Sequence, residues 1–242
     1  MKKRGNGFGG LTGCICILAA LLGFFAGSAL AADVKEITDA SGQWKYTLID
    51  EGAVLVGWTE KPEGALVMPD VLDGHVITGI GKDAFYECKD LTGITLPNGL
   101  TSIGFRAFYN CESLTGITLP DSLMSIGNRA FDSCKSLTGI TLPDGLISIG
   151  DYAFTGCSGL FGITLPDSLI SIGTNPFSRS QMAFISVSAD NPMYAQIDGV
   201  LYNKQQKMLV AYPDAREGAY SIPEGVVRIG KLVSMRFTDA AA

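Results

Sequence analysis

A period of 23 residues governs the middle of this chain. Four consecutive segments, which begin at Leu91, Leu114, Leu137 and Leu160, align at this period without gaps. The first segment is LTGITLPNGLTSIGFRAFYNCES, and the next two keep its apolar positions. Repetition at a fixed period of about 20–50 residues predicts units that stack on one another, because a single unit cannot bury its apolar side chains alone.

Each segment opens with the pattern Leu-x-x-Ile-x-Leu, which is the strand signature of leucine-rich repeats. In the first segment, Leu91, Ile94 and Leu96 are expected to point inward. Side chains alternate along a strand, so Gly93 and Thr95 are expected to point outward. The proline that follows ends the strand, because proline cannot donate a ladder hydrogen bond.

A second apolar set follows each strand, and in the first segment it consists of Leu100, Ile103, Ala107, Phe108 and Cys111. Its spacing predicts a return stretch with a short helical turn around residues 106–110. We therefore expect an α/β leucine-rich-repeat solenoid that is rich in β-structure. The inner face is predicted to be a parallel β-sheet, and the outer face to hold short helical or 3₁₀ turns and extended segments.

The chain is predicted to have four regions. Residues 1–32 are expected to be a signal peptide, and residues 33–65 an N-terminal β-hairpin cap. Residues 66–182 are expected to be leucine-rich repeats of 23 residues, and residues 183–242 irregular and incomplete C-terminal repeats.

The cap is expected from two alternating stretches, Trp44–Ile49 and Ala53–Trp58, which flank a polar turn. Such a hairpin could cover the open edge of the first repeat. That repeat is longer than the others, since 11 positions separate Pro69 from Ile80 where 6 separate Pro97 from Ile103.

The N-terminus has the organisation of a secretion signal. Residues 2–4 are basic, residues 15–26 form an apolar core, and residues 29–31 give a small-x-small cleavage pattern. An uncleaved membrane anchor and a lipidated Cys14 are the alternatives. We expect a protein that is secreted or lies at the cell surface, with membrane contact only through this segment.

The formal net charge of the chain is −6. An acidic protein repels phosphate backbones, so nucleic acid is not an expected partner.

The chain resembles the BspA-like leucine-rich repeats of bacterial and protozoan surface proteins. The resemblance rests on the recurring motifs ITLP, SIG and AF with a closing Cys, and it extends over residues 44–230. The segments at residues 73–77 and 197–202 are also similar to that family. The resemblance implies a secreted or surface-attached protein that binds host proteins, matrix proteins or other cells, and it implies no catalytic residue. The last repeat departs from the pattern, since Val233 and Ser234 stand where Ala and Phe are expected.

Two residue types recur at one phase and are predicted to form a structural ladder in the core. The ladder residues are Phe85, Phe108, Phe131, Phe154, Phe177, Cys88, Cys111, Cys134 and Cys157. Disulfides are an alternative in an exported protein. However, in-register neighbours about 4.8 Å apart keep parallel side chains, whereas a disulfide needs Cβ atoms about 3.5–4.5 Å apart. A zinc site would need four sulfurs that converge on one point, which a row does not provide.

Two surfaces are candidates for binding. The candidate inner binding face is a threonine ladder of Thr95, Thr118, Thr141 and Thr164. The candidate variable edge, where the repeats differ, consists of Phe105, Arg106, Tyr109, Asn128, Arg129, Asp151 and Tyr152. The uniform face suits a repetitive partner or none, while the irregular edge is expected to carry protein selectivity. A solvated β-face with good cross-strand packing is the alternative for the threonines.

No catalytic residues, metal ligands or cofactors are predicted. His75 is the only histidine, so no histidine-based triad is expected to recur in the repeats. Asp121, Asp144 and Asp167 form a ladder whose spacing invites comparison with a glycosidase pair. A ladder gives its carboxylates equal surroundings, so their pKa values are not split, and turn-forming aspartates are the expected role. Weak calcium binding is the remaining alternative.

The leading hypothesis is a secreted or cell-surface protein that mediates protein–protein binding or adhesion. Its partner is expected to be a protein or cell-surface component of a host, a matrix or a neighbouring cell. One alternative is a structural spacer that recognises nothing. Another is a threonine face that organises water or ice, or that binds a polymer.

Overall fold

The structure is a computed structural model that describes residues 35–50, 52–215 and 220–230. The predicted signal peptide lies outside these residues, as does the chain after residue 230. The described residues form strands and turns, and none of them lies in a helix. Among them there is accordingly no helix that could span a membrane.

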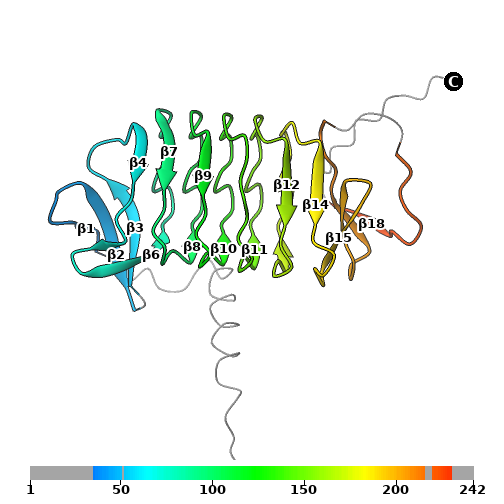
Figure 1. Cartoon of the computed structure of the whole chain (residues 1–242), viewed down its shortest axis with the longest axis horizontal. Helices are drawn as coiled ribbons and strands as arrows, with labels where there is room; N and C mark the ends of the chain where they lie inside the picture. Colours follow the sequence, from blue (N-terminus) through cyan, green and yellow to red (C-terminus); the bar gives the residue numbers. More distant parts are fainter. Residues whose placement is uncertain (1–34, 51, 216–219, 231–242) are drawn as a thin grey trace, which may run out of the picture. The chain divides into compact units, whose positions relative to one another are not determined.

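The Leu-x-x-Ile-x-Leu segments that begin at Leu91, Leu114 and Leu160 contribute three strands to the first set of parallel strands, which stand in a row in Figure 1 with one further strand at each end. These strands are β4 (Gly64–Val67), β7 (Leu91–Thr95), β9 (Gly116–Thr118), β12 (Gly162–Leu165) and β14 (Phe184–Val187). Equivalent residues of successive repeats lie opposite each other, as Ile94 does to Ile117. The strand predicted at the start of the segment from Leu137 is not formed, and a single bridge between Gly116 and Gly139 joins this segment to β9.

A second sheet runs beside the first and contains the Ser-Ile pairs of the repeats. Its strands, in spatial order, are β1 (Ile37–Thr38), β2 (Trp44–Ile49), β3 (Gly52–Trp58), β6 (His75–Ile80), β8 (Ser102–Ile103), β10 (Ser125–Ile126), β11 (Ser148–Ile149) and β13 (Ser171–Ile172). From β3 onward all neighbours are parallel. The predicted stacking of parallel strands at constant phase is therefore confirmed.

The helical turn predicted around residues 106–110 is absent, because the described residues contain no helix. Arg106 and Asn110 have φ angles of 52° and 59°, which belong to the left-handed region and interrupt a right-handed helix. The segment is instead a series of tight turns, in which the N–H of Tyr109 donates to the carbonyl of Arg106 at 3.1 Å.

Alternate N–H groups of this segment bond to the next repeat. Arg106, Phe108 and Asn110 donate to backbone carbonyls of residues 128, 130 and 132 at 3.0, 2.7 and 2.8 Å. The same pattern recurs one repeat later from Arg129, Phe131 and Ser133. Bonds between repeats thus replace the bonds that a helix would have made within one repeat.

Hairpins occupy the N-terminal end of the second sheet. β2 pairs antiparallel with β3, as the alternation predicts, and β3 pairs parallel with β6 of the first repeat. The extra residues of that repeat form β5 (Val71–Leu72), which pairs antiparallel with β6. Asp73 and Gly74 join them with φ angles of 48° and 86°, the two left-handed residues of a type I′ turn.

The C-terminal part is a small mixed sheet, in which three strands are antiparallel. Its strands are β15 (Tyr194–Ile197), β16 (Val200–Asn203), β17 (Met208–Ala211) and the parallel-paired β18 (Arg228–Ile229). The hydroxyl of Tyr194 accepts a hydrogen bond from the N–H of Ile172 in β13 at 2.9 Å. A side chain therefore satisfies a backbone group at the end of the second sheet.

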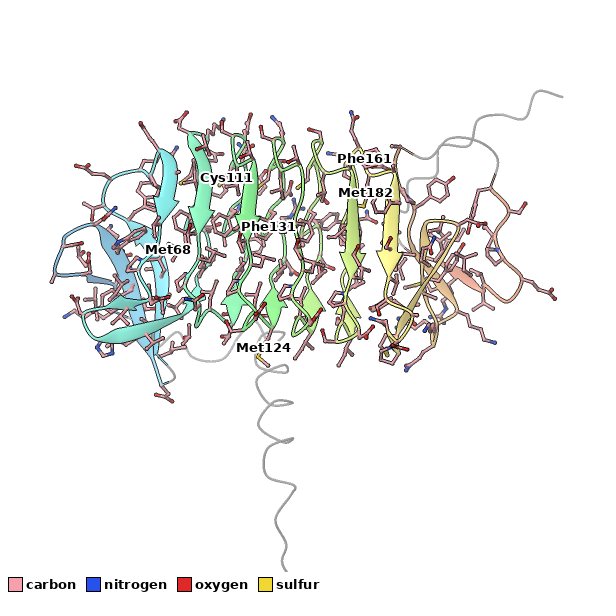
Figure 2. The ribbon with its side chains drawn as sticks, viewed as in Figure 1. Met68, Cys111, Met124, Phe131, Phe161 and Met182 are labelled. Carbon is pink, nitrogen blue, oxygen red and sulfur yellow. The ribbon has the colours of Figure 1, made fainter. Side chains whose placement is uncertain are left out.

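The core is a continuous row of side chains that occupy equivalent positions in successive repeats, and Figure 2 labels two of them, Cys111 and Phe131. The rings of Phe85, Phe108, Phe131, Phe154 and Phe177 stack with centroid separations of 5.0, 5.2, 5.3 and 6.0 Å. The first four are completely buried. Stability is thus shared between neighbouring repeats, since each ring packs against the repeats on both sides.

Close backbone contact explains the glycine of the SIG motif. A Cβ atom at Gly150 would lie 2.4 Å from Oδ1 and 2.5 Å from N of Asn128 in the preceding repeat. A Cβ at Gly139, on the outward side of the first row of strands, would meet nothing within 4 Å. Packing therefore requires glycine at position 150 but not at position 139.

Phe131→Ala should lower the free energy of unfolding by about 3–5 kcal/mol, because it removes a buried ring that contacts two other rings. The matched variant Phe105→Ala removes a ring that is 38% exposed and should cost less than about 1 kcal/mol. Denaturant unfolding measures both. Equal losses would contradict the stacked core.

Gly150→Ala should destabilise the protein by about 1–3 kcal/mol, because the neighbouring backbone must shift. Gly139→Ala is its control and should leave stability unchanged or raise it by up to about 1 kcal/mol. Thermal unfolding compares the two variants, and a stable Gly150→Ala protein would contradict the close contact.

Candidate functional site

The outward residues of the first row of strands form two columns. Gly93 lies opposite Gly116, and Thr95 lies opposite Thr118. The full columns are Gly93, Gly116, Gly139 and Gly162, and Thr95, Thr118, Thr141 and Thr164. All four threonines are exposed, and their hydroxyls have no hydrogen-bond partner among the described residues. The structure thus brings the predicted inner-face residues together as one row of free hydroxyl groups.

The last three members of each column, from Gly116 and Thr118 onward, line a shallow groove of about 510 Å³. Its lining residues are Ile94, Gly116, Ile117, Thr118, Gly139, Ile140, Thr141, Gly162, Ile163, Thr164 and Phe184. None of them is charged. The floor is open, because a Cβ at Gly116 or Gly139 would meet nothing within 4 Å.

An aromatic pair closes one end of this groove. Phe184 pairs with Gly162 and so takes the next place in the glycine column. Its ring lies over Gly162, where a Cβ would be 2.4 Å from its Cζ atom. Phe161 meets Phe184 edge to face at 5.8 Å, and the two side chains are 62% and 42% exposed.

The variable edge is divided between contact residues and residues with structural roles. Asn128 Oδ1 accepts a hydrogen bond from the N–H of Asp151 at 2.8 Å. Asp151 Oδ1 in turn accepts one from the N–H of Thr174 at 2.6 Å. These two side chains therefore link successive repeats.

The other residues of the edge form an aromatic cluster around Arg106. The guanidinium carbon of Arg106 lies 4.7 Å from the ring centre of Phe105 and 5.1 Å from that of Tyr86, which stacks on Tyr109 at 5.1 Å. Nε of Arg106 lies 2.8 Å from Oδ1 of Asp83, so each of these buried atoms is the partner of the other. We call Tyr86, Phe105, Arg106 and Tyr109 the arginine–aromatic cluster.

A second, smaller contact of the same type lies further along the edge. Arg129 lies 4.7 Å from the ring centre of Tyr152 and pairs with Asp132 at 2.9 Å. Its side chain is 42% exposed. The edge therefore presents positive groups held against aromatic rings.

The four cysteines are buried free thiols in one row. Each of Cys111, Cys134 and Cys157 donates its S–H to a phenylalanine carbonyl of the preceding repeat at 3.1 Å. Burial raises the pKa of the Cys88 thiol to about 11 and that of Cys157 to about 12, and it also raises the pKa values of Cys111 and Cys134. The protonated form is favoured because a thiolate would lose its hydration here.

The aspartates that follow the strands are exposed turn residues. Within the described ranges, no group of three or more His, Cys, Asp or Glu side chains is arranged to hold a metal ion. His75 lies beside the ring of Tyr46 at a centroid distance of 6.4 Å, at the start of β6.

Sequence reasoning missed three aromatic residues of these surfaces. Phe161 and Phe184 lie at one end of the groove, but β14 follows β12 at a spacing of 22 residues, so the expected period of 23 does not place Phe184 in the glycine column. Tyr86 belongs to the longer first repeat. Its position 23 residues before Tyr109 was the available signal.

The comparisons with known proteins agree with this geometry. The model of the BspA type leucine rich repeat region matches residues 78–197 with six copies. Among curated protein sequences, none matches this chain significantly.

Several solved structures are similar. A leucine-rich-repeat protein of T. pallidum is 26% identical, with a TM-score of 0.57, over 85% of this chain and 83% of that one. A leucine-rich cell surface protein of Faecalibacterium prausnitzii is 27% identical, with a TM-score of 0.54, over 83% of this chain and 66% of that one. A leucine-rich-repeat protein of Eubacterium ventriosum is 29% identical, with a TM-score of 0.61, over 81% of this chain and 56% of that one. The chain therefore spans less than two thirds of the last two proteins. The resemblance and the leucine-rich-repeat fold predicted from the sequence are confirmed.

The thiol row predicts a loss of stability in alkali. The thiol pKa is 9.0 in the unfolded chain and higher in the fold, so the unfolded chain releases its thiol protons first as the pH rises. The free energy of unfolding should therefore fall as the pH rises above 9.0. The contribution of Cys88 to this fall should end near its folded-state pKa of about 11, and that of Cys157 near about 12. Each thiol contributes a slope of up to about 1.4 kcal/mol per pH unit.

Denaturant unfolding between pH 8 and pH 11 measures this slope, and Cys134→Ala should make it shallower. If Cys134→Ala leaves the slope unchanged, the buried thiols are not the cause of the pH dependence. Peptide mapping after alkylation at neutral pH should find these four thiols unmodified in the native protein and modified in denaturant.

Proposed function

Because this chain belongs to the BspA-type leucine-rich-repeat family, we propose that it is an exported cell-surface protein that mediates adhesion by binding other proteins. The partner is a protein of a host, a matrix or a neighbouring cell. The observation that carries this proposal is the arginine–aromatic cluster on the variable edge.

The composition of the cluster is that of a protein-binding hot spot. Tyrosine and arginine are enriched among residues that dominate binding energy at protein interfaces. They combine a large apolar area with polar ends that remain available for hydrogen bonds. Phe105 adds an exposed apolar ring, and Lys82 lies 5.9 Å from its centre.

The cluster is also preorganised. The rings of Tyr86 and Tyr109 are stacked at an interplanar angle of 5°, and the ion pair with Asp83 holds Arg106 between aromatic neighbours. A partner that binds here immobilises few rotamers, so less conformational entropy opposes binding. The inter-repeat backbone bonds keep the underlying segment rigid.

The location is supported by two independent features. The N-terminal sequence has a basic start, an apolar core and a small-residue cleavage pattern. The similar protein of Faecalibacterium prausnitzii is described as a cell surface protein. Binding does not require a catalytic group, and we assign no enzymatic activity to the chain.

The test is binding of the full chain to immobilised matrix proteins and to whole animal and bacterial cells. The double variant Tyr86→Ala, Tyr109→Ala should bind at least about tenfold more weakly, because hot-spot truncations cost about 2 kcal/mol or more. The double variant Thr118→Val, Thr141→Val leaves the cluster intact and should bind these proteins as the parent does.

Circular dichroism shows whether each variant is folded. Unchanged binding by the tyrosine variant would place the protein site elsewhere. Absence of binding to every protein and cell type would favour the spacer hypothesis.

A further inference from the structure

We propose that the groove lined by the glycine and threonine columns is a second binding site, and that its ligand is a neutral polysaccharide of β-1,4-linked sugars. The groove is built from residues 94–184, on the outward side of the first row of strands. The arginine–aromatic cluster lies in the return turns of the repeats. The carbohydrate site is therefore independent of the protein-binding site.

The lining of the groove selects a neutral ligand. Its residues are isoleucines, glycines, threonines and one phenylalanine, whereas the whole chain carries 24 acidic and 18 basic residues. A charged ligand buried in the groove would find no opposite charge to compensate its lost hydration. Uncharged hydroxyl, ether and amide groups match the free threonine hydroxyls, which both donate and accept hydrogen bonds.

The spacing of the threonines suits a polymer of sugar rings. Successive repeats are about 5 Å apart, as the separations of 5.0–5.3 Å between their phenylalanine rings show, so a chain that crosses the repeats meets an equivalent hydroxyl at each step of this length. One ring of a β-1,4-linked polysaccharide advances by a similar distance. The three threonines that line the groove, Thr118, Thr141 and Thr164, would therefore contact about three successive sugars.

A polypeptide fits the same face poorly. An extended peptide advances about 3.3 Å per residue, so its side chains would not keep step with the threonines. Peptides that add to a sheet bind at its edge, where backbone groups are free. Here the ligand would lie on the face of the strands, whose backbone pairing runs between repeats.

The end of the groove adds a stacking surface. Sugar rings have apolar C–H faces, and aromatic side chains are common partners for such flat ligands. Phe184 and Phe161 are both exposed and held edge to face. The glycine floor lets a ring approach the backbone, because no side chain stands above Gly116 or Gly139.

Isothermal titration of the full chain with cellohexaose and with chitohexaose tests the proposal. Both are neutral and β-1,4-linked, and they differ in the substituent at C2, so the pair shows which sugar is preferred. Binding of either supports the site. Maltohexaose is α-linked and oligogalacturonate is charged, and both should bind at least about tenfold more weakly. A tenfold weaker affinity corresponds to the loss of about one hydrogen bond.

Variants locate the site. Thr118→Val, Thr141→Val keeps the shape and strand preference of the side chains but removes two hydroxyls, and it should weaken binding at least about tenfold. Phe184→Ala should also weaken it. The control Tyr86→Ala, Tyr109→Ala should bind the oligosaccharide as the parent does, although it loses protein binding.

Three results would overturn the proposal. The first is that neither β-linked oligosaccharide binds. The second is that maltohexaose or oligogalacturonate binds as tightly as the β-linked oligosaccharides or more tightly. The third is that the folded variant Thr118→Val, Thr141→Val binds with full affinity. Loss of sugar binding in the tyrosine variant alone would place the sugar at the cluster instead. Because each double variant is assayed with both ligand classes, failure of the protein-binding function and failure of the sugar site give different results.

Discussion

Backbone hydrogen bonds that join each repeat to its neighbours are the constraint on which the other features depend. They run between strands on two sides of the repeat and, on the third side, from alternate N–H groups of the turn segment to carbonyls of the next repeat. Because each repeat satisfies its backbone groups on the next one, every repeat is held at the same phase. Phenylalanine rings 5.0–5.3 Å apart in the central repeats follow from that alignment.

The same alignment produces two different kinds of surface. Where successive repeats carry the same residue, the outcome is a uniform column such as the exposed threonines. Where they differ, the outcome is a local cluster such as the one around Arg106, which contacts the rings of Tyr86 and Phe105. A uniform column suits a ligand that itself repeats, and a local cluster suits one feature of a folded partner. One backbone design can therefore present two recognition surfaces.

Departures from the period of 23 residues determine the structure at the ends of the repeat array. Extra residues in the first repeat form the β5–β6 hairpin, in which β6 also pairs with β3. A spacing of 22 residues between β12 and β14 brings Phe184 into the glycine column. Neither effect follows from the repeated pattern, since a change of length decides which residue pairs with which. The contact between Phe161 and Phe184 could therefore be identified only from the strand register in the structure.

The amino-acid sequence by itself determined the period, most of the repeat strands, the inward Leu and Ile positions and the row of phenylalanines, because each depends on a pattern that recurs at one phase. It also identified the threonine column and most of the arginine–aromatic cluster. Only the tertiary structure decided that residues 106–110 form turns instead of a helix, because the competing hydrogen-bond acceptors belong to the next repeat. It likewise decided that Asn128 and Asp151 link repeats, since their partners become neighbours only when the chain has stacked.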